Sequence, residues 1–476
     1  MNKKMSVLLL SFCLILAVAG CGTGNNSESK PSNGQTASPS SEAGESPAAS
    51  GGLPIIGGGE LKYDPNVQVN EGKEAKLTFW STPNFYDYYV QAAAEYSKIH
   101  PNVKFDVVNV AGNDYNTKIA VALQGSSAPD LLFIHNSMNQ LIPNLAPYPE
   151  EILPYETLKK DFRQVDQHEV DGKLYYIDMG IMTSGIYYSK AAFEEAGLTE
   201  ADIPETWEEL AQIAKKLTKY DNTGKVIRAG FNYNGEFQYV LGAMNAQSGL
   251  WFFGEDGQSA NLNHPEVLKH AQWLKDLYDV EKVGSNLLPT MRESFGSGKA
   301  AMVYSWGWFG GYNQVNFPDF EYGFFKLPHF EGQEPVAYDR NNGEASPAVS
   351  KNSKNQAIAF DFIKFLLAND DLLVKFDLLN SNAPSKYVLD NHPDVLNDQV
   401  VKVQSEALDR TIWVGPVPAI WEQDMKKYLE EDFLINNVPL QQAIDNASKM
   451  INKDLKDTGF VSIERKYFKN ADNMKQ

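Results

Sequence analysis

Strands and helices alternate along residues 75 to 134, and this order constrains the fold more than any other feature of the sequence. Leu77 and Phe79 occupy alternate positions of a strand that ends at Trp80, and a helix with apolar residues at helical spacing follows. The remaining elements of this segment are a strand, a helix and a buried strand over residues 103 to 107, 115 to 124 and 129 to 134. The order β-α-β-α-β predicts an α/β fold with an open, mainly parallel sheet.

Residues 204 to 210 predict the start of a further helix. Thr206 is the expected N-cap, and Glu209 three residues later completes a capping box. No repeat of fixed period runs through the chain, which argues against a solenoid or a propeller. About 400 residues remain after the N-terminal region, and this length favours two lobes over one core.

The first twenty residues predict secretion. Lys3 and Lys4 are followed by an apolar stretch from Val7 to Val18, which is the pattern of a signal peptide and is short for a membrane span. Val18-Ala19-Gly20 precedes Cys21 and resembles the lipobox of bacterial lipoproteins, in which the thiol carries a diacylglyceryl group. An ordinary signal peptide that happens to contain a cysteine is the alternative.

Residues 21 to 74 differ in composition from the rest of the chain. Ser, Gly, Pro, Asn and Glu dominate this segment, and such a composition buries too little apolar surface to offset chain entropy. We therefore expect a disordered tether between a lipid-anchored Cys21 and the folded body.

The charge balance excludes one class of partner. Removal of a signal that carries Lys3 and Lys4 leaves 40 basic and 61 acidic side chains, a net charge of −21. This field repels polyphosphate, so nucleic acid is not an expected partner. Aromatic residues make up 12% of the chain, with eight Trp and 23 Tyr, which suits a site that recognises flat sugar faces as well as a core.

Seven short motifs, in order, resemble the bacterial extracellular solute-binding proteins of family 1, the maltose-binding-protein-like group. They run from about residue 75 to 430 and comprise Lys76-Leu77-Thr78-Phe79-Trp80, Ala128-Pro129-Asp130-Leu131-Leu132, Asp171-Gly172-Lys173-Leu174-Tyr175, Ile186-Tyr187-Tyr188-Ser189-Lys190, the helix at 204 to 210, Phe295 to Met302, and Ser350 to Phe365. Each motif is weak alone, and the set in this order is specific to the family.

The resemblance implies a two-lobed periplasmic-binding-protein-like fold of type II, each lobe a mainly parallel sheet flanked by helices, joined by a hinge that the chain crosses three times. We place the crossings near Met179, Arg340 and Leu396. Lobe one then comprises residues 75 to 179 and 341 to 396, and lobe two comprises 180 to 340 and 397 to 476. Ligand is expected in the cleft between the lobes, where loops at the carboxyl ends of strands converge.

Candidate ligand contacts in lobe one follow the first and third strands. Trp80 ends the first strand, and Asn84 and Phe85 follow it; Asn84 stands where maltose binders carry an acidic sugar contact. For Trp80 and Phe85 a place in the core is the alternative. After the third strand, His135 and Asn136 replace the aromatic and acidic contacts of maltose binders, and we take Asn136 as the candidate because its amide both donates and accepts.

The candidates in lobe two are mainly aromatic. Tyr188 matches a ligand-contacting tyrosine of the family, whereas Tyr187 points to the opposite face of the strand. Trp306 and Trp308 lie in a glycine-rich cluster after the buried strand 300 to 304, and Trp308 aligns with a stacking tryptophan of the family. Two further candidates are Asn342, in the stretch Asp339 to Glu344 at the second crossing, and Trp421, which matches a family stacking position; Trp413 is more doubtful.

No cofactor or metal is expected, because the seven histidines show no metal-ligand pairing and Gly296-Ser297-Gly298-Lys299 lacks the first glycine of a phosphate-binding loop. The resemblance implies a binding protein rather than an enzyme: a monomer on the outer face of the cell membrane that captures a carbohydrate and delivers it to the permease subunits of an ABC importer. Two alternatives remain. One is a secreted glycoside hydrolase, since 61 acidic residues leave room for a carboxylate pair, and the other is a sugar sensor or adhesin without transport.

Overall fold

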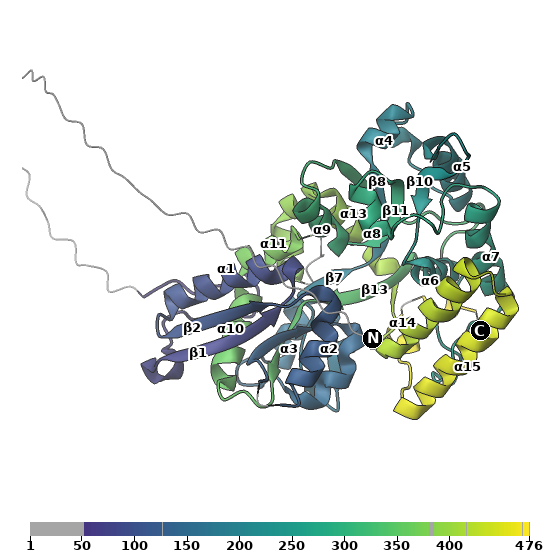
Figure 1. Cartoon of the computed structure of the whole chain (residues 1–476). Helices are drawn as coiled ribbons and strands as arrows, with labels where there is room; N and C mark the ends of the chain where they lie inside the picture. Colours follow the sequence, from purple (N-terminus) through teal and green to yellow (C-terminus); the bar gives the residue numbers. More distant parts are fainter. Residues whose placement is uncertain (1–51, 126, 380–384, 416, 469, 476) are drawn as a thin grey trace, which may run out of the picture. The chain divides into compact units, whose positions relative to one another are not determined.

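The computed structural model describes residues 52 to 125, 127 to 379, 385 to 415, 417 to 468 and 470 to 475. Two five-stranded sheets, each covered by helices, organise these residues, and a small three-stranded sheet connects them (Figure 1). The predicted signal peptide, Cys21 and most of the expected tether lie outside the described residues. Within the described ranges, no helix combines the length and the apolar character needed to cross a membrane.

The first sheet has the order β2-β1-β3-β14-β4. β1 (Ala75–Ser81) pairs in parallel with β2 (Val103–Asn109) and β3 (Leu131–Ile134), while β14 (Ser346–Ser350) runs antiparallel to β3 and to β4 (Leu145–Ala146). The helices α1 (Pro83–Ile99) and α2 (Gly112–Ala122) connect the parallel strands. The predicted β-α-β-α-β unit is therefore confirmed.

Further helices complete the region around the first sheet. They are α3 (Tyr155–Asp161), α10 (Gln356–Ala368), α11 (Asp370–Asp377) and α12 (Lys386–Asn391). One apolar core joins these helices to the sheet, and it contains Leu77, Phe79 and Phe133.

The second sheet has the order β12-β8-β11-β10-β9 and only one parallel pair, β10 (Val226–Asn232) with β11 (Ala300–Trp306). β8 (Ser184–Ser189) is antiparallel to β11 and to β12 (Tyr322–Phe325), and β9 (Lys219–Tyr220) is antiparallel to β10. The sheets are thus mixed, and the expectation of mainly parallel sheets was wrong for this one. β8 enters the sheet directly after β7, without the helical crossover that a parallel neighbour requires.

Both faces of the second sheet are covered. Its helices are α4 (Lys190–Glu195), α5 (Trp207–Leu217), α6 (Phe237–Gln247), α7 (Pro265–Asp279), α8 (Met291–Gly296), α9 (Trp308–Asn316) and α13 (Gln399–Ala407). The predicted capping box of α5 is present: the Glu209 amide donates to Thr206 Oγ1 at 3.1 Å, and the Thr206 amide donates to Glu209 Oε2 at 3.2 Å. The C-terminal part adds α14 (Ala419–Met425), the π-helix η7 (Lys426–Ile435), α15 (Leu440–Thr458) and α16 (Glu464–Tyr467).

The connecting sheet consists of β15 (Thr411–Trp413), β13 (Asp339–Glu344) and β7 (Gly180–Met182). β7 leads directly into β8 of the second sheet, and β13 leads directly into β14 of the first sheet. The chain therefore passes between the two sheets at these strands, beside the crossings expected near Met179 and Arg340. The lobe limits themselves, with a third crossing near Leu396, stay a prediction.

The expected tether was drawn too long, because the last part of residues 21 to 74 belongs to the folded body. Leu61, Tyr63 and Val69 are buried in the core of the first sheet, and the Tyr63 hydroxyl donates to Asp361 at 2.8 Å. The Glu60 amide donates to Asp161 at 2.9 Å. The average composition of residues 21 to 74 concealed these apolar anchors, which attach the last part of the segment to the folded body.

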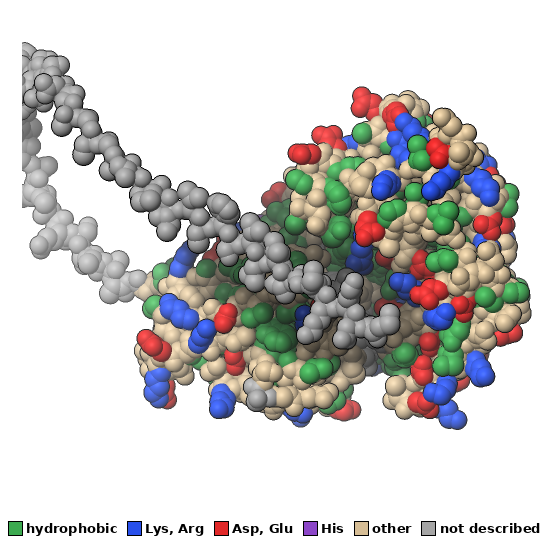
Figure 2. Space-filling model, in the orientation of Figure 1, with side chains coloured by type: hydrophobic (Ala, Val, Ile, Leu, Met, Phe, Trp, Pro, Cys, Tyr) green, Lys and Arg blue, Asp and Glu red, His purple; other side chains and the backbone are tan. Residues whose placement is uncertain are grey.

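Acidic and basic side chains are interspersed over the visible face of the molecule in Figure 2. On this face neither the acidic nor the basic side chains gather in a single field.

Candidate functional site

One cavity of about 240 Å³ lies where strands from both sheets end. His135 reaches it from the end of β3, Glu236 follows β10, and Trp306 ends β11. Ligands of open α/β sheets bind outside the carboxyl ends of strands, so the position alone makes this cavity the candidate site. The other lining residues are Met182, Tyr239, Arg292, Trp308, Arg340, Asn341, Asn342, Val414, Gly415, Val417 and Glu422.

An arginine forms the polar wall of the cavity. Arg340 is nine-tenths buried, and its Nη2 donates to Glu422 Oε1 at 3.1 Å. The guanidinium carbon lies 5.1 Å from the ring centroid of Tyr239 and 5.3 Å from that of Trp306. Burial opposes the charge of Arg340, but the neighbouring acidic groups, Glu422 first, together outweigh it and raise the pKa of the guanidinium. The two rings and the carboxylate thus hold a permanent cation with donors at the cavity.

A second arginine stands over the more accessible tryptophan. Arg292, from α8, places its guanidinium carbon 4.5 Å from the ring centroid of Trp308. Its side chain is 47% exposed, and its closest carboxylate oxygen is Glu236 Oε1 at 4.0 Å, the limit of an ion pair. Arg292 therefore keeps donors available to a bound molecule.

Glu236 is the buried carboxyl of the site. It precedes α6, is 6% exposed, and belongs to a turn in which Gly235 has φ +89°, a value that glycine adopts without strain. Burial raises the pKa of Glu236 to about 8, against the opposing effect of Arg292. Near neutral pH this carboxyl is largely protonated, so it both donates and accepts hydrogen bonds.

His135 supplies the contact from the first sheet. Its Nε2 lies 3.2 Å from Asn116 Oδ1, and loss of solvent around the ring lowers its pKa to about 4. The imidazole is therefore neutral at the cavity. Among the described residues, no three His, Cys, Asp or Glu side chains gather in a way that would hold a metal ion.

The structure brings three of the predicted contacts to the cavity, namely Trp306, Trp308 and Asn342. Trp306 is 7% exposed and forms part of the wall, whereas Trp308 is partly exposed. Trp421 lies behind the cavity: it is buried against Phe252 and Phe253, beside Glu422, which does line the cavity.

Four further predicted contacts, Phe85, Tyr188, Trp80 and Asn84, do not line the cavity. Phe85 is buried and stacks on Phe376, with 5.4 Å between the ring centroids. It is therefore a core residue, which was the alternative for this position. Tyr188 is 2% exposed and packs on Phe193.

Trp80 is half-buried against the first core, and Asn84 is exposed in the first turn of α1. Asn136 begins the 3₁₀ segment Asn136–Asn144, and its side chain lies outside what the structure describes.

Several cavity residues were missed from the sequence, above all Tyr239, Glu236, Arg292 and Glu422. Glu236 and Tyr239 lie three residues apart at the start of one helix, directly after an Asn-Gly turn that ends a buried strand. This signal was available in the sequence. Nothing in the sequence relates Arg292 to Trp308 or Glu422 to Arg340.

Comparison with known proteins identifies the family of the chain. Residues 80 to 371 match the family model described as bacterial extracellular solute-binding protein, which is more than half of the chain. The chain belongs to this family. As a solute-binding protein it is not an enzyme, and membership decides against the glycoside hydrolase that the sequence left open.

The relatives of this solute-binding protein are distant. A lactose-binding protein of Rhizobium radiobacter is 28% identical over 207 residues, which cover 41% of this chain and only 47% of that protein. An arabinooligosaccharide-binding protein of Halalkalibacterium halodurans is 25% identical over 66% of this chain and 73% of that protein.

Solved structures show the same fold. A Thermotoga lettingae ABC transporter solute-binding protein with bound α-D-tagatose superimposes with a TM-score of 0.69 at 20% identity, covering 80% of this chain and all of that one. The maltose/maltodextrin-binding domain MalE of Bdellovibrio bacteriovorus, bound to maltotriose, has a TM-score of 0.67 at 18% identity, with coverage of 80% and 100%. The α/β periplasmic-binding-protein fold predicted from the sequence is therefore confirmed.

Proposed function

We propose that this solute-binding protein captures a mono- or oligosaccharide in the cavity and delivers it to an ABC importer. The observation that carries the proposal is the combination of Trp308 and Tyr239 rings with guanidinium and carboxyl groups at one cavity. Aromatic rings provide faces for the apolar side of a pyranose, and the charged groups provide directional partners for its hydroxyls. Lactose, arabino-oligosaccharides, tagatose and maltotriose, named for the relatives and the solved structures, fit this class.

The groups of the cavity suit a ligand with many hydroxyls. Arg340 is already paired with Glu422, the protonated carboxyl of Glu236 both donates and accepts, and Arg292 offers further donors. Each hydrogen bond to a hydroxyl contributes only about 0.5–1.5 kcal/mol net, because water is displaced from both partners. Micromolar affinity, about 8 kcal/mol, therefore requires several of these groups at once.

Membrane attachment and transport complete the proposal. Cys21 carries the diacylglyceryl anchor, residues after it form the tether, and the two acyl chains hold the protein on the outer face of the cell membrane. The protein acts as a monomer and meets the permease subunits of the importer there. Trp80, Asn84 and Asn136, which follow strands of the first sheet, remain candidate contacts if the two sheets approach each other around the ligand.

A binding screen tests the proposal directly. Thermal unfolding of the full chain is measured with lactose, arabinotriose, maltotriose and tagatose, since a ligand that binds only the folded state raises the melting temperature. Isothermal titration then gives the affinity for each hit in the wild type and in Trp308→Ala. Failure of a broad set of saccharides to stabilise the protein would refute carbohydrate capture. Labelling with radioactive palmitate, compared with Cys21→Ser, tests the anchor separately.

A further inference from the structure

A buried glutamate supports the candidate site from outside the cavity. Glu430 is 4% exposed and lies on η7, and its Oε1 accepts a hydrogen bond from the Gly235 amide. Its second oxygen, Oε2, is buried and has no hydrogen-bond partner among the described residues. A buried carboxylate that serves a single backbone amide costs free energy, which suggests a role beyond packing.

The helix that carries Glu430 has an unusual form. η7 (Lys426–Ile435) is π-helical over its whole length and packs against α6, the helix that begins after Glu236. π-Helical turns are rare in proteins, and those that interrupt α-helices are found frequently at functional sites.

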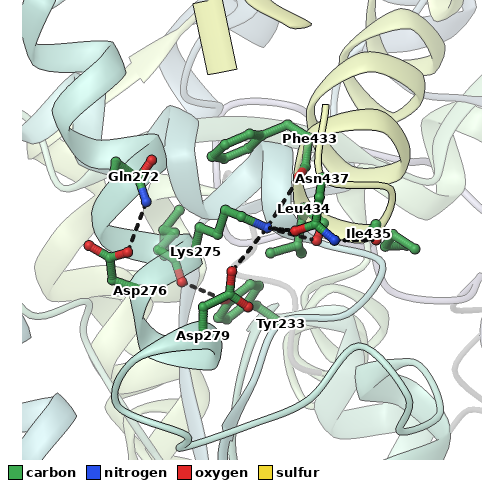
Figure 3. Close-up of polar contacts among 10 residues, drawn as sticks. Tyr233, Gln272, Lys275, Asp276, Asp279, Phe433, Leu434, Ile435 and Asn437 are labelled. Atoms are coloured by element: carbon green, nitrogen blue, oxygen red, sulfur yellow. Dashed lines mark hydrogen bonds and ion pairs between the residues drawn. The ribbon is translucent and has the colours of Figure 1, made fainter. Parts of the chain in front are cut away.

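The C-terminal end of this helix is anchored by a lysine from α7 (Figure 3). Lys275 is 9% exposed, and its Nζ donates to the carbonyls of Phe433 at 3.3 Å and Leu434 at 3.2 Å, and to Asn437 Oδ1 at 2.7 Å. A cation at this end satisfies carbonyls that have no partner within the helix and complements the helix dipole. Lys275 thus stabilises the conformation that directs Glu430 to Gly235.

The turn that Glu430 reaches leads into the site. Asn234 and its neighbours fix one side of it: the Asn234 amide donates to Asn232 Oδ1 at 2.8 Å, and the Glu236 amide donates to the Tyr233 carbonyl at 2.9 Å. The Gly235 amide points away from these bonds and meets Glu430 instead. Glu430 therefore fixes the Asn234–Gly235 peptide, one peptide group before the one that joins Gly235 to the cavity residue Glu236.

We propose that Glu430 is a positioning residue of the ligand site, which holds the Asn234–Gly235 peptide and so keeps the next residue, Glu236, directed at the ligand as a neutral hydrogen-bonding carboxyl. This inference rests on the proposed function for its ligand, but its central element, the coupling of Glu430 to Glu236, exists in the unliganded protein. The coupling has two parts. One is the hydrogen bond to Gly235. The other is the charge of Glu430, which in its ionised form disfavours ionisation of Glu236; burial raises the pKa of Glu430, while the Gly235 amide and Lys426 lower it.

The charged groups around Glu236 define what Glu430 adds. Burial has the largest effect on the pKa of Glu236 and raises it. Glu430 and Glu422 raise this pKa further, whereas Arg292 from α8 and Lys426 from η7 lower it. α7 and β13 also pack on α6 and carry Lys275 and Arg340, respectively. Lys275 donates to carbonyls of η7, and Arg340 is paired with Glu422.

The first experiment needs no ligand. The carboxyl carbon of Glu236 is followed by NMR against pH in the full chain labelled at glutamate, with the signal assigned by its loss in Glu236→Gln. The midpoint, expected near 8 in the wild type, should fall in Glu430→Gln. Glu431→Gln is the matched control, because it removes the same charge from the same helix at a side chain that is 47% exposed and paired with Lys427. An unchanged midpoint in Glu430→Gln, or an equal change in the control, would overturn the proposal.

The second experiment measures binding of whichever of lactose, arabinotriose, maltotriose or tagatose the wild type binds. Glu430→Ala should weaken affinity about tenfold, the effect of one lost hydrogen bond to a charged group. Glu430→Gln retains an acceptor for Gly235 and should recover part of the lost affinity. The pH at which affinity changes should shift to a lower value, because Glu236 then ionises more easily. Wild-type affinity in a folded Glu430→Ala would contradict the inference. If no saccharide binds to the wild type, the proposed function fails, while the NMR midpoint still decides whether Glu430 controls Glu236.

Discussion

Arg340 and Glu422 are 82 residues apart in the sequence and form an ion pair of 3.1 Å at the cavity. The Arg340 side chain is 11% exposed and that of Glu422 is 29% exposed, so the pair is shielded from solvent on one side and open on the other. Tyr239 joins it, since its hydroxyl donates to Glu422 Oε2 at 3.3 Å. The pair connects the strand β13, which runs between the two sheets, to the C-terminal helix α14.

Replacement of Glu422 by Gln should therefore affect stability and binding together. Arg340 would keep its charge without a carboxylate partner, and the free energy of unfolding should fall by about 1–3 kcal/mol, less than for a fully buried pair because Glu422 is partly exposed. Urea denaturation measures this loss. Glu334→Gln is the matched control: it removes a carboxylate from Arg410 at the surface, where Glu334 is 77% exposed, and should leave the transition unchanged. Equal behaviour of the two variants would show that the cavity pair contributes nothing to stability.

Trp308→Ala should weaken saccharide binding about tenfold and leave the fold intact, because the ring is partly exposed at the cavity rather than central to a core. Titration calorimetry gives the affinity, and the melting temperature without ligand reports the fold. Trp273→Ala serves for comparison, since Trp273 is also partly buried but packs on Trp207 away from the cavity. A variant at Trp308 that binds as tightly as wild type would remove this ring from the site.

The sequence predicted the fold well because its periodic signals are local. The alternation of strand and helix before residue 134, the capping box at Thr206 and the buried strand after residue 300 each depend on neighbours within a few positions. The direction of the strands in the second sheet depends instead on how the chain returns from the connecting sheet. No short segment encodes that path, and the prediction of mainly parallel sheets failed there.

The site was predicted only in part for a similar reason. Period-two alternation placed Tyr187 and Tyr188 on opposite faces of β8, but both faces of this strand are covered, so both rings are buried in separate cores. Trp308 was identifiable because it lies just after a buried strand and aligns with a stacking tryptophan of the family that the sequence resembles. The arginines and glutamates of the cavity come from four separate elements, and only the tertiary fold brings them together.

Lys275→Met should destabilise the C-terminal region, because three acceptors at the end of η7 lose their donor while the apolar part of the side chain is retained. The expected loss in the free energy of unfolding is about 2–3 kcal/mol, the penalty for leaving buried polar groups without a partner. Lys427→Met, on η7 itself, is the control, since this lysine lies at the surface beside Glu431 and Asp432. Hydrogen exchange at Phe433 to Asn437 should increase only in the Lys275 variant. Unchanged exchange there would mean that the lysine does not anchor the π-helix.

Stability should fall as the pH rises from 6.5 to 8. Burial raises the pKa of Glu236 to about 8 and that of Glu464 to about 7, so in this range the folded state holds protons that the unfolded state, with ordinary carboxyl pKa values near 4.5, has released. Folding is then linked to proton uptake, and the stabilisation present at low pH is lost as pH approaches the folded pKa values.

The buried histidines act in the opposite direction but in a lower range. Burial lowers the pKa values of His135 and His270 to about 4, so these residues add stability as pH rises from about 4 to their ordinary value of 6.5, and little beyond it. Above pH 6.5 the carboxyls dominate, and one carboxyl changes the free energy of unfolding by at most about 2 kcal/mol over this window. Urea denaturation at pH 6.5 and pH 8 measures the difference in the wild type and in Glu236→Gln. The variant should show the smaller decline, because it has no proton to release at that position, and an equal decline in both proteins would show that Glu236 does not titrate in this range.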